Sequence, residues 1–269
     1  MKFNPAKIRT TILDMAHSGQ TVHVACAFSI VEIAAVLYRS VLDLGDGTVG
    51  CQKRDKLILS KGHGVMALYA CLEELGWLDK KTIIDYFQDG SELKGLSECN
   101  VPGLEVSSGS LGHGLSVAVG LALAAKKKGS DRKIYCIVGD GEMNEGAIWE
   151  GILFAAHFKL DNFILVVDEN KYQAMGTTKE VMDMGNIKSK LDAFGFFTLE
   201  ANGHNEADLL DKFQKLLKNT EGKPKALVAD TVKGYGVSFM HANNAWHYSR
   251  LTDETHKAAV NELKQGQKS

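Results

Sequence analysis

The sequence is poor in proline and has no cysteine motif. Its 269 residues include only three prolines and no low-complexity linker, so we expect a single domain. The five cysteines are an odd number, and no two of them form a CxxC pair. A disulfide framework and a cysteine zinc site are therefore not expected. We predict reduced thiols in a cytoplasmic protein.

Long apolar runs and an excess of one charge are also missing. No stretch approaches the ~18 apolar residues that span a bilayer. The first residues lack the apolar core of a signal peptide. Lysine and arginine number 31, and aspartate and glutamate 33, which leaves a net charge of −2. We expect no membrane and no nucleic acid as partner, so any anionic ligand must be bound by a local group of residues.

What the sequence does contain is an alternation of short apolar runs and helical patterns. This alternation is typical of a parallel sheet covered on both faces. We predict a doubly wound α/β fold with a mostly parallel sheet and helices on both faces. The predicted strands are residues 56–60, 133–138, 163–168, 194–200 and 225–231. The predicted helices span about residues 4–17, 65–75, 80–88, 114–128, 145–158 and 205–218.

Two local signals add to this assignment. Ser29, followed three residues later by Glu32, has the pattern of a capping box and predicts a helix that starts there. Residues 263–269, "LKQGQKS", are expected to form a frayed tail.

A glycine-flanked aspartate follows one of the predicted strands. Asp140 stands between Gly139 and Gly141, and Asn170 follows the next strand. Parallel neighbours lie roughly 4.8 Å apart, and ligands bind beyond the carboxyl ends of such strands. The glycines allow a sharp turn and close approach to a ligand. A carboxylate and an amide oxygen suit Mg²⁺ or Ca²⁺ whose other ligands are phosphate oxygens, so we predict a diphosphate-bearing cofactor.

Rival motifs fail at single residues. A P-loop needs lysine where Ala147 stands, and a GxGxxG fingerprint needs glycine where Asn144 stands. An EF-hand loop beginning at Asp140 would need other residues than Glu145 and Gly151. A plain tight turn with an acidic N-cap remains the structural alternative.

Longer motifs carry a family resemblance. The pair "GDGEMNEG" and "VVDENKYQ" resembles the thiamine-diphosphate motif. The stretches "LSKGHGVMALYACL", "GLEVSSGSLGHGLSVAVGLALAAK", "VMDMGNIKSKLDAFGF" and "KGYGVSFMHANNAWHYSRL" resemble transketolase in order and spacing, over almost the whole chain. The chain is similar to the N-terminal, diphosphate-binding subunit of a split transketolase.

This resemblance implies an architecture and an activity. Residues 1–269 would form one thiamine-diphosphate-binding domain. The pyrimidine-binding and C-terminal domains would lie on a partner chain, in an α2β2 assembly. The implied activity is transfer of a two-carbon ketol unit from a ketose (phosphate) to an aldose (phosphate) through thiamine diphosphate and Mg²⁺ or Ca²⁺. The alternatives are the α subunit of a 2-oxo acid dehydrogenase, a pyruvate-using enzyme like deoxyxylulose-phosphate synthase, and a degenerate thiamine-binding scaffold.

The resemblance also implies roles for individual residues. The metal ligands would be Asp140, Asn170 and the main-chain carbonyl of Tyr172. The catalytic residues would be His23, His63 and His247. The cofactor-binding residues would be His63, Gly109, Leu111, Gly139, Asp140, Gly141, Glu142, Asn170 and His247. Glu145 falls where the family links two cofactor sites, although an acid in the first turn of a helix explains it equally well.

Three departures from the family pattern concern the substrate. His23 stands in the register of a family histidine whose usual surrounding motif is absent, and His17 is the competing candidate. Leu96 replaces a histidine that contacts a donor hydroxyl, and an apolar side chain cannot make that hydrogen bond. His113 stands where glutamine is usual. Leu96 and His113 are therefore the candidates for an altered donor specificity.

Overall fold

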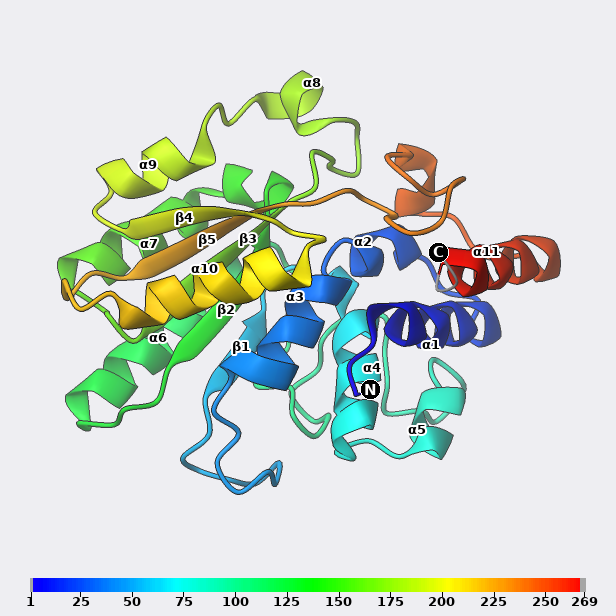
Figure 1. Ribbon diagram of the computed structural model, residues 1–269, viewed down its shortest axis with the longest axis horizontal. Coiled ribbons are helices and arrows are strands. Elements are labelled where there is room, and N and C mark those ends of the chain that lie inside the picture. Colours follow the sequence, from blue (N-terminus) through cyan, green and yellow to red (C-terminus); the bar gives the residue numbers. More distant parts are fainter. Residues whose placement is uncertain (1, 267–269) are drawn as a thin grey trace.

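The computed structural model describes residues 2–266, and a five-stranded sheet forms its centre. All neighbouring strands are parallel, in the order β1-β2-β3-β5-β4 (Figure 1). This confirms the predicted α/β class. The strands are β1 (Lys56–Leu59), β2 (Ile134–Gly139), β3 (Phe163–Glu169), β4 (Phe197–Asn202) and β5 (Lys225–Asp230).

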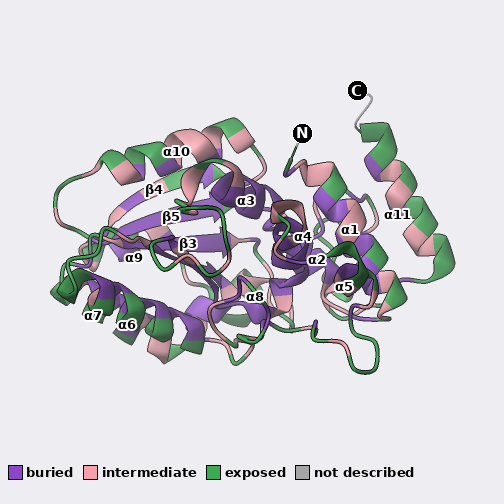
Figure 2. Cartoon of the chain, turned by 90° about the horizontal axis from the view of Figure 1, so that it is seen from below, coloured by how far each residue is buried: buried purple, intermediate pink, exposed green. Residues whose placement is uncertain are grey.

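Helices cover both faces of the sheet, as the apolar strands require. All six residues of β2 are buried, so neither face of this strand meets solvent. On one face pack α6 (His113–Lys127) and α7 (Gly146–His157); α3 (Val31–Val36) and α10 (Glu206–Lys218) lie on the other (Figure 2). The sheet therefore separates two apolar cores.

A second group of helices lies beyond one end of the sheet (Figure 1). Here α1 packs against α4 and α11 and brings the two ends of the described chain together. The group comprises α1 (Pro5–Ser18), α2 (Val24–Phe28), α4 (Met66–Leu75), α5 (Lys80–Ile84) and α11 (Asp253–Gly266). The other helical elements are the π-helix η1 (Leu37–Val41), α8 (Thr178–Met182), α9 (Ile187–Ala193), and the 3₁₀ turns η2 (Gly62–Gly64), η3 (Gly141–Asn144) and η4 (Asn244–His247).

The predicted capping box at Ser29 is wrong. Ser29 ends α2, and Ile30 precedes α3 without a side-chain cap. The Ser29 hydroxyl instead donates to Asp168 at 2.7 Å, and the Glu32 carboxylate pairs with Arg9 at 2.6 Å. Both polar side chains serve distant partners because this segment lies in the core, where local capping would leave those partners unpaired.

The ends of three other predicted segments differ from those in the structure. The strand predicted from residue 194 starts at Phe197, since α9 ends at Ala193 and Gly195 turns the chain with φ +95°. Residues 263–266 belong to α11 instead of a frayed tail, and residues 267–269 of that prediction lie outside the described residues. The helix predicted over 80–88 ends at Ile84.

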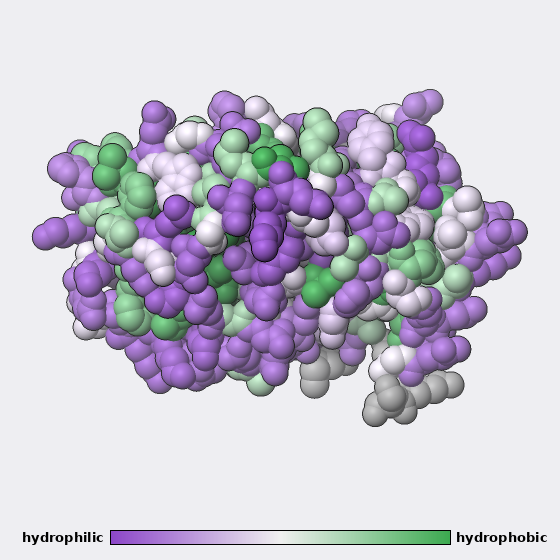
Figure 3. All heavy atoms as spheres, turned by 90° about the horizontal axis from the view of Figure 1, so that it is seen from above, coloured by the Kyte–Doolittle hydropathy of each residue, from purple (hydrophilic) through white to green (hydrophobic). Residues whose placement is uncertain are grey.

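The surface is largely hydrophilic on the side seen in Figure 3, where hydrophobic side chains form separate small groups. Within the described part of the chain, no helix combines the length and the apolar character needed to cross a membrane.

Candidate functional site

A cavity of about 400 Å³ opens beyond the carboxyl ends of β2 and β3. It brings together segments that lie up to 224 residues apart, from His23 to His247. Every predicted metal, cofactor and catalytic residue lines it, and so does Leu96. Its full lining is His23, Lys61, His63, Leu96, Gly109, Leu111, Gly139, Asp140, Gly141, Glu142, Asn170, Tyr172, Gln173, Ala174, Met175 and His247.

Asp140 lies at the end of β2, beside β3, as predicted. Gly139 is in register with Asp168, and the Asp140 main chain donates to the Asp168 carbonyl at 3.1 Å. The Asp140 carboxylate accepts from the Lys171 and Gly141 main-chain N–H groups, at 2.7 and 2.8 Å. Burial, together with the charge of Asp168, raises the pKa of Asp140 to about 7. A cation bound to this carboxylate would favour its charged form.

The two flanking glycines differ in the space around them. Neither Gly139 nor Gly141 has a positive φ, so a sharp left-handed turn is not what they provide. At Gly141 a Cβ would lie 2.7 Å from the Gln173 side chain, so a glycine lets this side chain pack closely. Around Gly139 the space is open, since only Lys61 comes within 4 Å of a Cβ built there.

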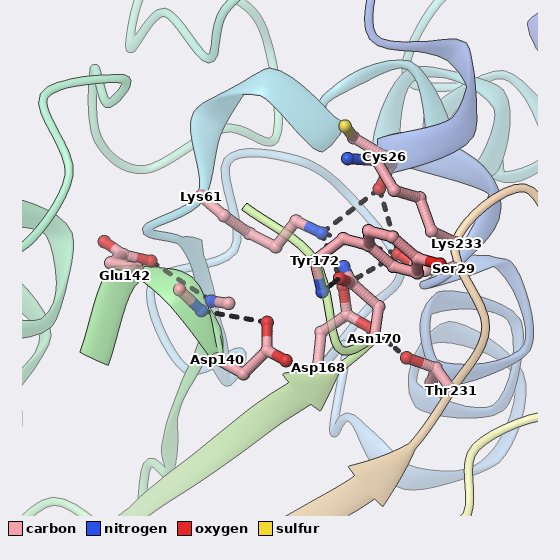
Figure 4. A network of polar contacts seen from close by, with 12 residues as sticks. Cys26, Ser29, Lys61, Asp140, Glu142, Asp168, Asn170, Tyr172, Thr231 and Lys233 are labelled. Carbon is pink, nitrogen blue, oxygen red and sulfur yellow. Dashed lines mark hydrogen bonds and ion pairs between the residues drawn. The ribbon is translucent and has the colours of Figure 1, made fainter. Parts of the chain in front are cut away.

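Behind Asn170 lies a buried network centred on Asp168 (Figure 4). Asp168 is fully buried and accepts hydrogen bonds from Lys61 at 2.5 Å, Ser29 at 2.7 Å, Asn170 at 2.9 Å, and Thr231. Burial alone would raise the pKa of Asp168, but the charge of Lys61 and these hydrogen bonds lower it below its ordinary value. The network fixes the Asn170 side chain, whose Oδ1 also accepts from the Tyr172 N–H at 3.0 Å.

Glu142 lines the cavity and is held by hydrogen bonds from three chain segments. Its carboxylate accepts from Ser60 at 2.5 Å and from the Gly112 and Gly139 N–H groups at 2.8 and 3.2 Å. Burial raises its pKa. Glu142 thus connects three chain segments around the cavity, and Glu145 is exposed beside them at the start of α7.

Three histidines form one wall of the cavity. The ring centroids lie 5.4 Å apart for His23 and His63, 5.3 Å for His23 and His247, and 5.8 Å for His63 and His247. Burial lowers the pKa of all three, and nearby lysine charges lower it further, to about 3 for His247. The imidazoles are therefore neutral near pH 7 and can accept or donate one hydrogen bond at each nitrogen.

The structure distinguishes the two competing histidines at the N-terminus. His23 lines the cavity with φ 69°, a left-handed conformation that is uncommon for a residue with a Cβ. His17 lies on α1, where it pairs with Asp253 at 2.8 Å and stacks on His256. Only His23 is close to the other predicted residues.

The two specificity candidates are separated. Leu96 lines the cavity and packs on Gly109, where a Cβ would lie 2.7 Å from the Leu96 side chain. Gly109 also has φ +148°, which favours glycine. His113 is exposed at the start of α6 and is not among the residues that line the cavity.

Sequence reasoning missed two buried lysines. Lys61 belongs to the network described above, and Lys233 lies 2.6 Å from His247 Nδ1 and 2.8 Å from Asn244 Oδ1. Both stand in motifs that were noted for other residues, "KGHG" and "KGYG". The signal that could have found them is a lysine that stands close to a buried strand in the sequence. A lysine that becomes buried there needs an acidic or anionic partner.

Known proteins resemble this chain over nearly its full length. A family model described as "Transketolase, thiamine diphosphate binding domain" matches residues 4–267. One subunit of the apulose-4-phosphate transketolase of Phocaeicola vulgatus is 36% identical, over 98% of this chain and 93% of its own. The 6-deoxy-6-sulfo-D-fructose transketolase subunit SqwG of a Clostridium species is 38% identical, over 90% of this chain and 88% of its own.

A solved structure gives the same picture of the fold. Transketolase from Campylobacter jejuni superimposes with a TM-score of 0.87 at 29% identity over 97% of this chain. The match covers 42% of that longer chain.

Proposed function

The chain belongs to the transketolase family, and on that premise we propose that its cavity holds thiamine diphosphate through a divalent cation for transfer of a two-carbon ketol unit. The relatives named above confirm the predicted family and a transketolase-type transferase that works with a partner chain. The metal, the residue roles, the substrates and the stoichiometry are the further content of the proposal.

The residues present fit this cofactor. Asp140 and Asn170 offer hard oxygens at one sheet edge, and the main-chain carbonyl of Tyr172 is the third proposed ligand, a set that suits Mg²⁺ or Ca²⁺. An anionic ligand is favoured by the ammonium group of Lys61 on the cavity wall and that of Lys233 behind it. Two buried side-chain nitrogens, His23 Nδ1 and Gln173 Nε2, have no hydrogen-bond partner within residues 2–266 and would gain one from a polar ligand.

Bound there, thiamine diphosphate would supply the electron sink for carbon–carbon cleavage. This chain would bind the diphosphate end and orient it through Asp140 and Asn170. His63 and His247, neutral near pH 7, would donate to phosphate or move protons at substrate oxygens, with His23 beside them. Gly109 and Leu111 would shape the wall next to the cofactor.

For the donor, we propose an uncommon ketose (phosphate). Leu96 faces the cavity and cannot hydrogen-bond a donor hydroxyl. The two relatives named above carry the names of uncommon ketoses, apulose 4-phosphate and 6-deoxy-6-sulfo-D-fructose, which supports this choice. His113 does not line the cavity, so it could affect specificity only if a partner chain brought it next to the substrate.

The partner in this proposal is a C-terminal transketolase subunit that carries the pyrimidine-binding and C-terminal domains, in an α2β2 assembly. The names of both relatives designate them as single subunits of a larger enzyme, which supports a second chain. Exposed apolar side chains on α6, on α7 and on the residue that follows α7 support self-association or partner binding. They are Val117, Leu121, Leu153, Phe154 and Phe158. The five free cysteines support a reducing, cytoplasmic location.

The convergence of Asp140, Asn170 and three histidines on one cavity carries the proposal. The test is calorimetry of the reconstituted pair with thiamine diphosphate and Mg²⁺, for wild type and Asp140→Asn, followed by a donor screen. We expect wild type to bind cofactor and the variant to lose most of the affinity. Absence of binding by wild type would revive the degenerate scaffold. Reductive acylation of a lipoyl domain would instead indicate a 2-oxo acid dehydrogenase, and ordinary rates with xylulose 5-phosphate would overturn the uncommon donor.

A further inference from the structure

Cys26 lies directly behind the histidine wall of the cavity. Its side chain is buried in α2, and Sγ is 3.8 Å from His247 Nδ1. Ligand atoms of His23, Cys26 and His247 all lie within 4.8 Å of one another. The thiol has no role in the proposed function; in the neighbouring network it is the Cys26 carbonyl that accepts a hydrogen bond, from Lys61.

The separation of Cys26 Sγ and His247 Nδ1 matches that of two ligands in a tetrahedral transition-metal site. With metal–sulfur and metal–nitrogen bonds of about 2.3 and 2.0–2.1 Å, two ligands of one zinc ion stand about 3.6 Å apart. The observed separation between Sγ and Nδ1 is 3.8 Å. In addition, His23 Nδ1 is buried and has no hydrogen-bond partner in the described part of the chain. A left-handed backbone conformation at His23 places this ring next to the other two groups.

We propose that Cys26, His23 and His247 form a second metal site, which takes a borderline-soft divalent ion such as Zn²⁺. One thiolate and two imidazoles are the ligands that such ions prefer, whereas Asp140 and Asn170 offer only hard ligands. The fourth position opens to the cavity, because His23 and His247 line it. Binding forms one metal–sulfur and two metal–nitrogen bonds and releases the thiol proton to the buffer.

Lys233 opposes this site. Its ammonium group contacts His247 Nδ1, the same atom that lies 3.8 Å from the thiol. The metal must displace Lys233 from this nitrogen and leave it bonded to Asn244 Oδ1 alone. Replacing Lys233 with an uncharged residue therefore strengthens metal binding, while replacing Cys26 weakens it. The two substitutions change the metal affinity in opposite directions, so a general loss of structure cannot explain both results.

The consequence for the enzyme rests on the proposed function. If His23 and His247 act on the substrate, an ion bound to both withdraws them from the reaction. Micromolar zinc would then inhibit the reconstituted enzyme, and a chelator would restore it. The metal site itself does not depend on this activity, so the two ideas can fail separately.

The direct test is titration of the full chain with Co²⁺, which reports its ligands by absorption. Wild type is expected to develop a thiolate-to-Co²⁺ charge-transfer band in the near ultraviolet. Cys26→Ser and Cys26→Ala should lose this band and bind at least tenfold more weakly. Lys233→Met should bind about tenfold more tightly. Cys99→Ser, which removes an exposed thiol, and Asp140→Asn are the matched controls and should keep the band.

A wild-type chain without the band, or a Cys26→Ser chain that retains it, would overturn the site. Calorimetry with thiamine diphosphate and Mg²⁺ on the same preparations shows separately whether the cofactor proposal stands. With the partner subunit, Cys26→Ala is expected to keep its basal activity and to resist zinc. Equal inhibition of this variant and wild type would place the inhibitory ion elsewhere and contradict the proposal.

Discussion

Two aspartates at the same edge of the sheet have pKa values that are shifted in opposite directions. Asp140 follows β2 and Asp168 lies near the end of β3, and both are almost completely buried. The pKa of Asp140 is raised to about 7 by burial and by Asp168. The pKa of Asp168 is lowered, because the charge of Lys61 and several hydrogen bonds outweigh its burial.

The two aspartates therefore have different roles: Asp168 supports the structure around the cavity, and Asp140 is available to a ligand. Asp168 is paired and hydrogen-bonded within the chain, so it has little capacity left for a ligand. Asp140 accepts two main-chain hydrogen bonds, and no cationic side chain of the described residues contacts its carboxylate. Removing a paired partner should therefore affect folding most, and removing an open group should affect binding most.

The largest effect on stability is expected for Lys61→Met. The substitution leaves the Asp168 charge buried without its ion-pair partner, so the free energy of unfolding should fall by about 3–5 kcal/mol. Urea denaturation measures this change. Lys61→Met/Asp168→Asn should recover part of the loss, and a double variant as unstable as the single one would contradict this role of the Asp168 charge.

A somewhat smaller effect, with a pH signature, is expected at Asp140. Without cofactor, the folded chain keeps this proton up to pH about 7, while the unfolded chain loses it near its ordinary pKa of 3.8. The folded state binds more protons in this window, so stability falls as pH rises from about 4 to 7, by about 4 kcal/mol at most. Asp140→Asn should lack this component. Its presence in the variant would refute the assignment to Asp140.

Loss of a single donor to Asp168 should cost less. Ser29→Ala removes one hydroxyl hydrogen bond to the carboxylate and leaves the Lys61 pair intact. We expect a loss of about 1.5–3 kcal/mol, in line with a hydrogen bond to a charged group. Thermal and urea unfolding of Ser29→Ala and Lys61→Met would show which partner of Asp168 contributes more to stability. A larger loss for Ser29→Ala would contradict the expected order.

The smallest effect on stability is expected at the histidine wall. The His63 side chain makes no hydrogen bond among the described residues, only ring contacts with His23 and His247. His63→Asn should change the free energy of unfolding by less than about 1 kcal/mol. The kcat of the reconstituted enzyme should nonetheless fall by roughly 10²–10⁴-fold. Unchanged kcat would remove His63 from the reaction.

Sequence patterns were sufficient to predict features that depend on neighbouring residues or on a repeated pattern. The parallel sheet follows from apolar runs that must be buried on both faces, and the position of Asp140 beside the end of β3 follows from that sheet. The same reasoning failed at Ser29, because its hydroxyl serves Asp168, 139 residues away. A local capping pattern contains no information about such a distant partner.

By itself, the sequence determined the fold class, the family and the cluster of residues expected around Asp140, because the alternation of strands and helices and the spacing of the motifs can be observed along the chain. Only the tertiary structure decided which charges are already paired. It placed His23 at the cavity and His17 against Asp253, and put Leu96 inside and His113 outside. It also enclosed Lys61 with Asp168 and put Cys26 behind two imidazoles. The physical reason is that burial and electrostatic pairing depend on distances between segments, which sequence spacing does not contain.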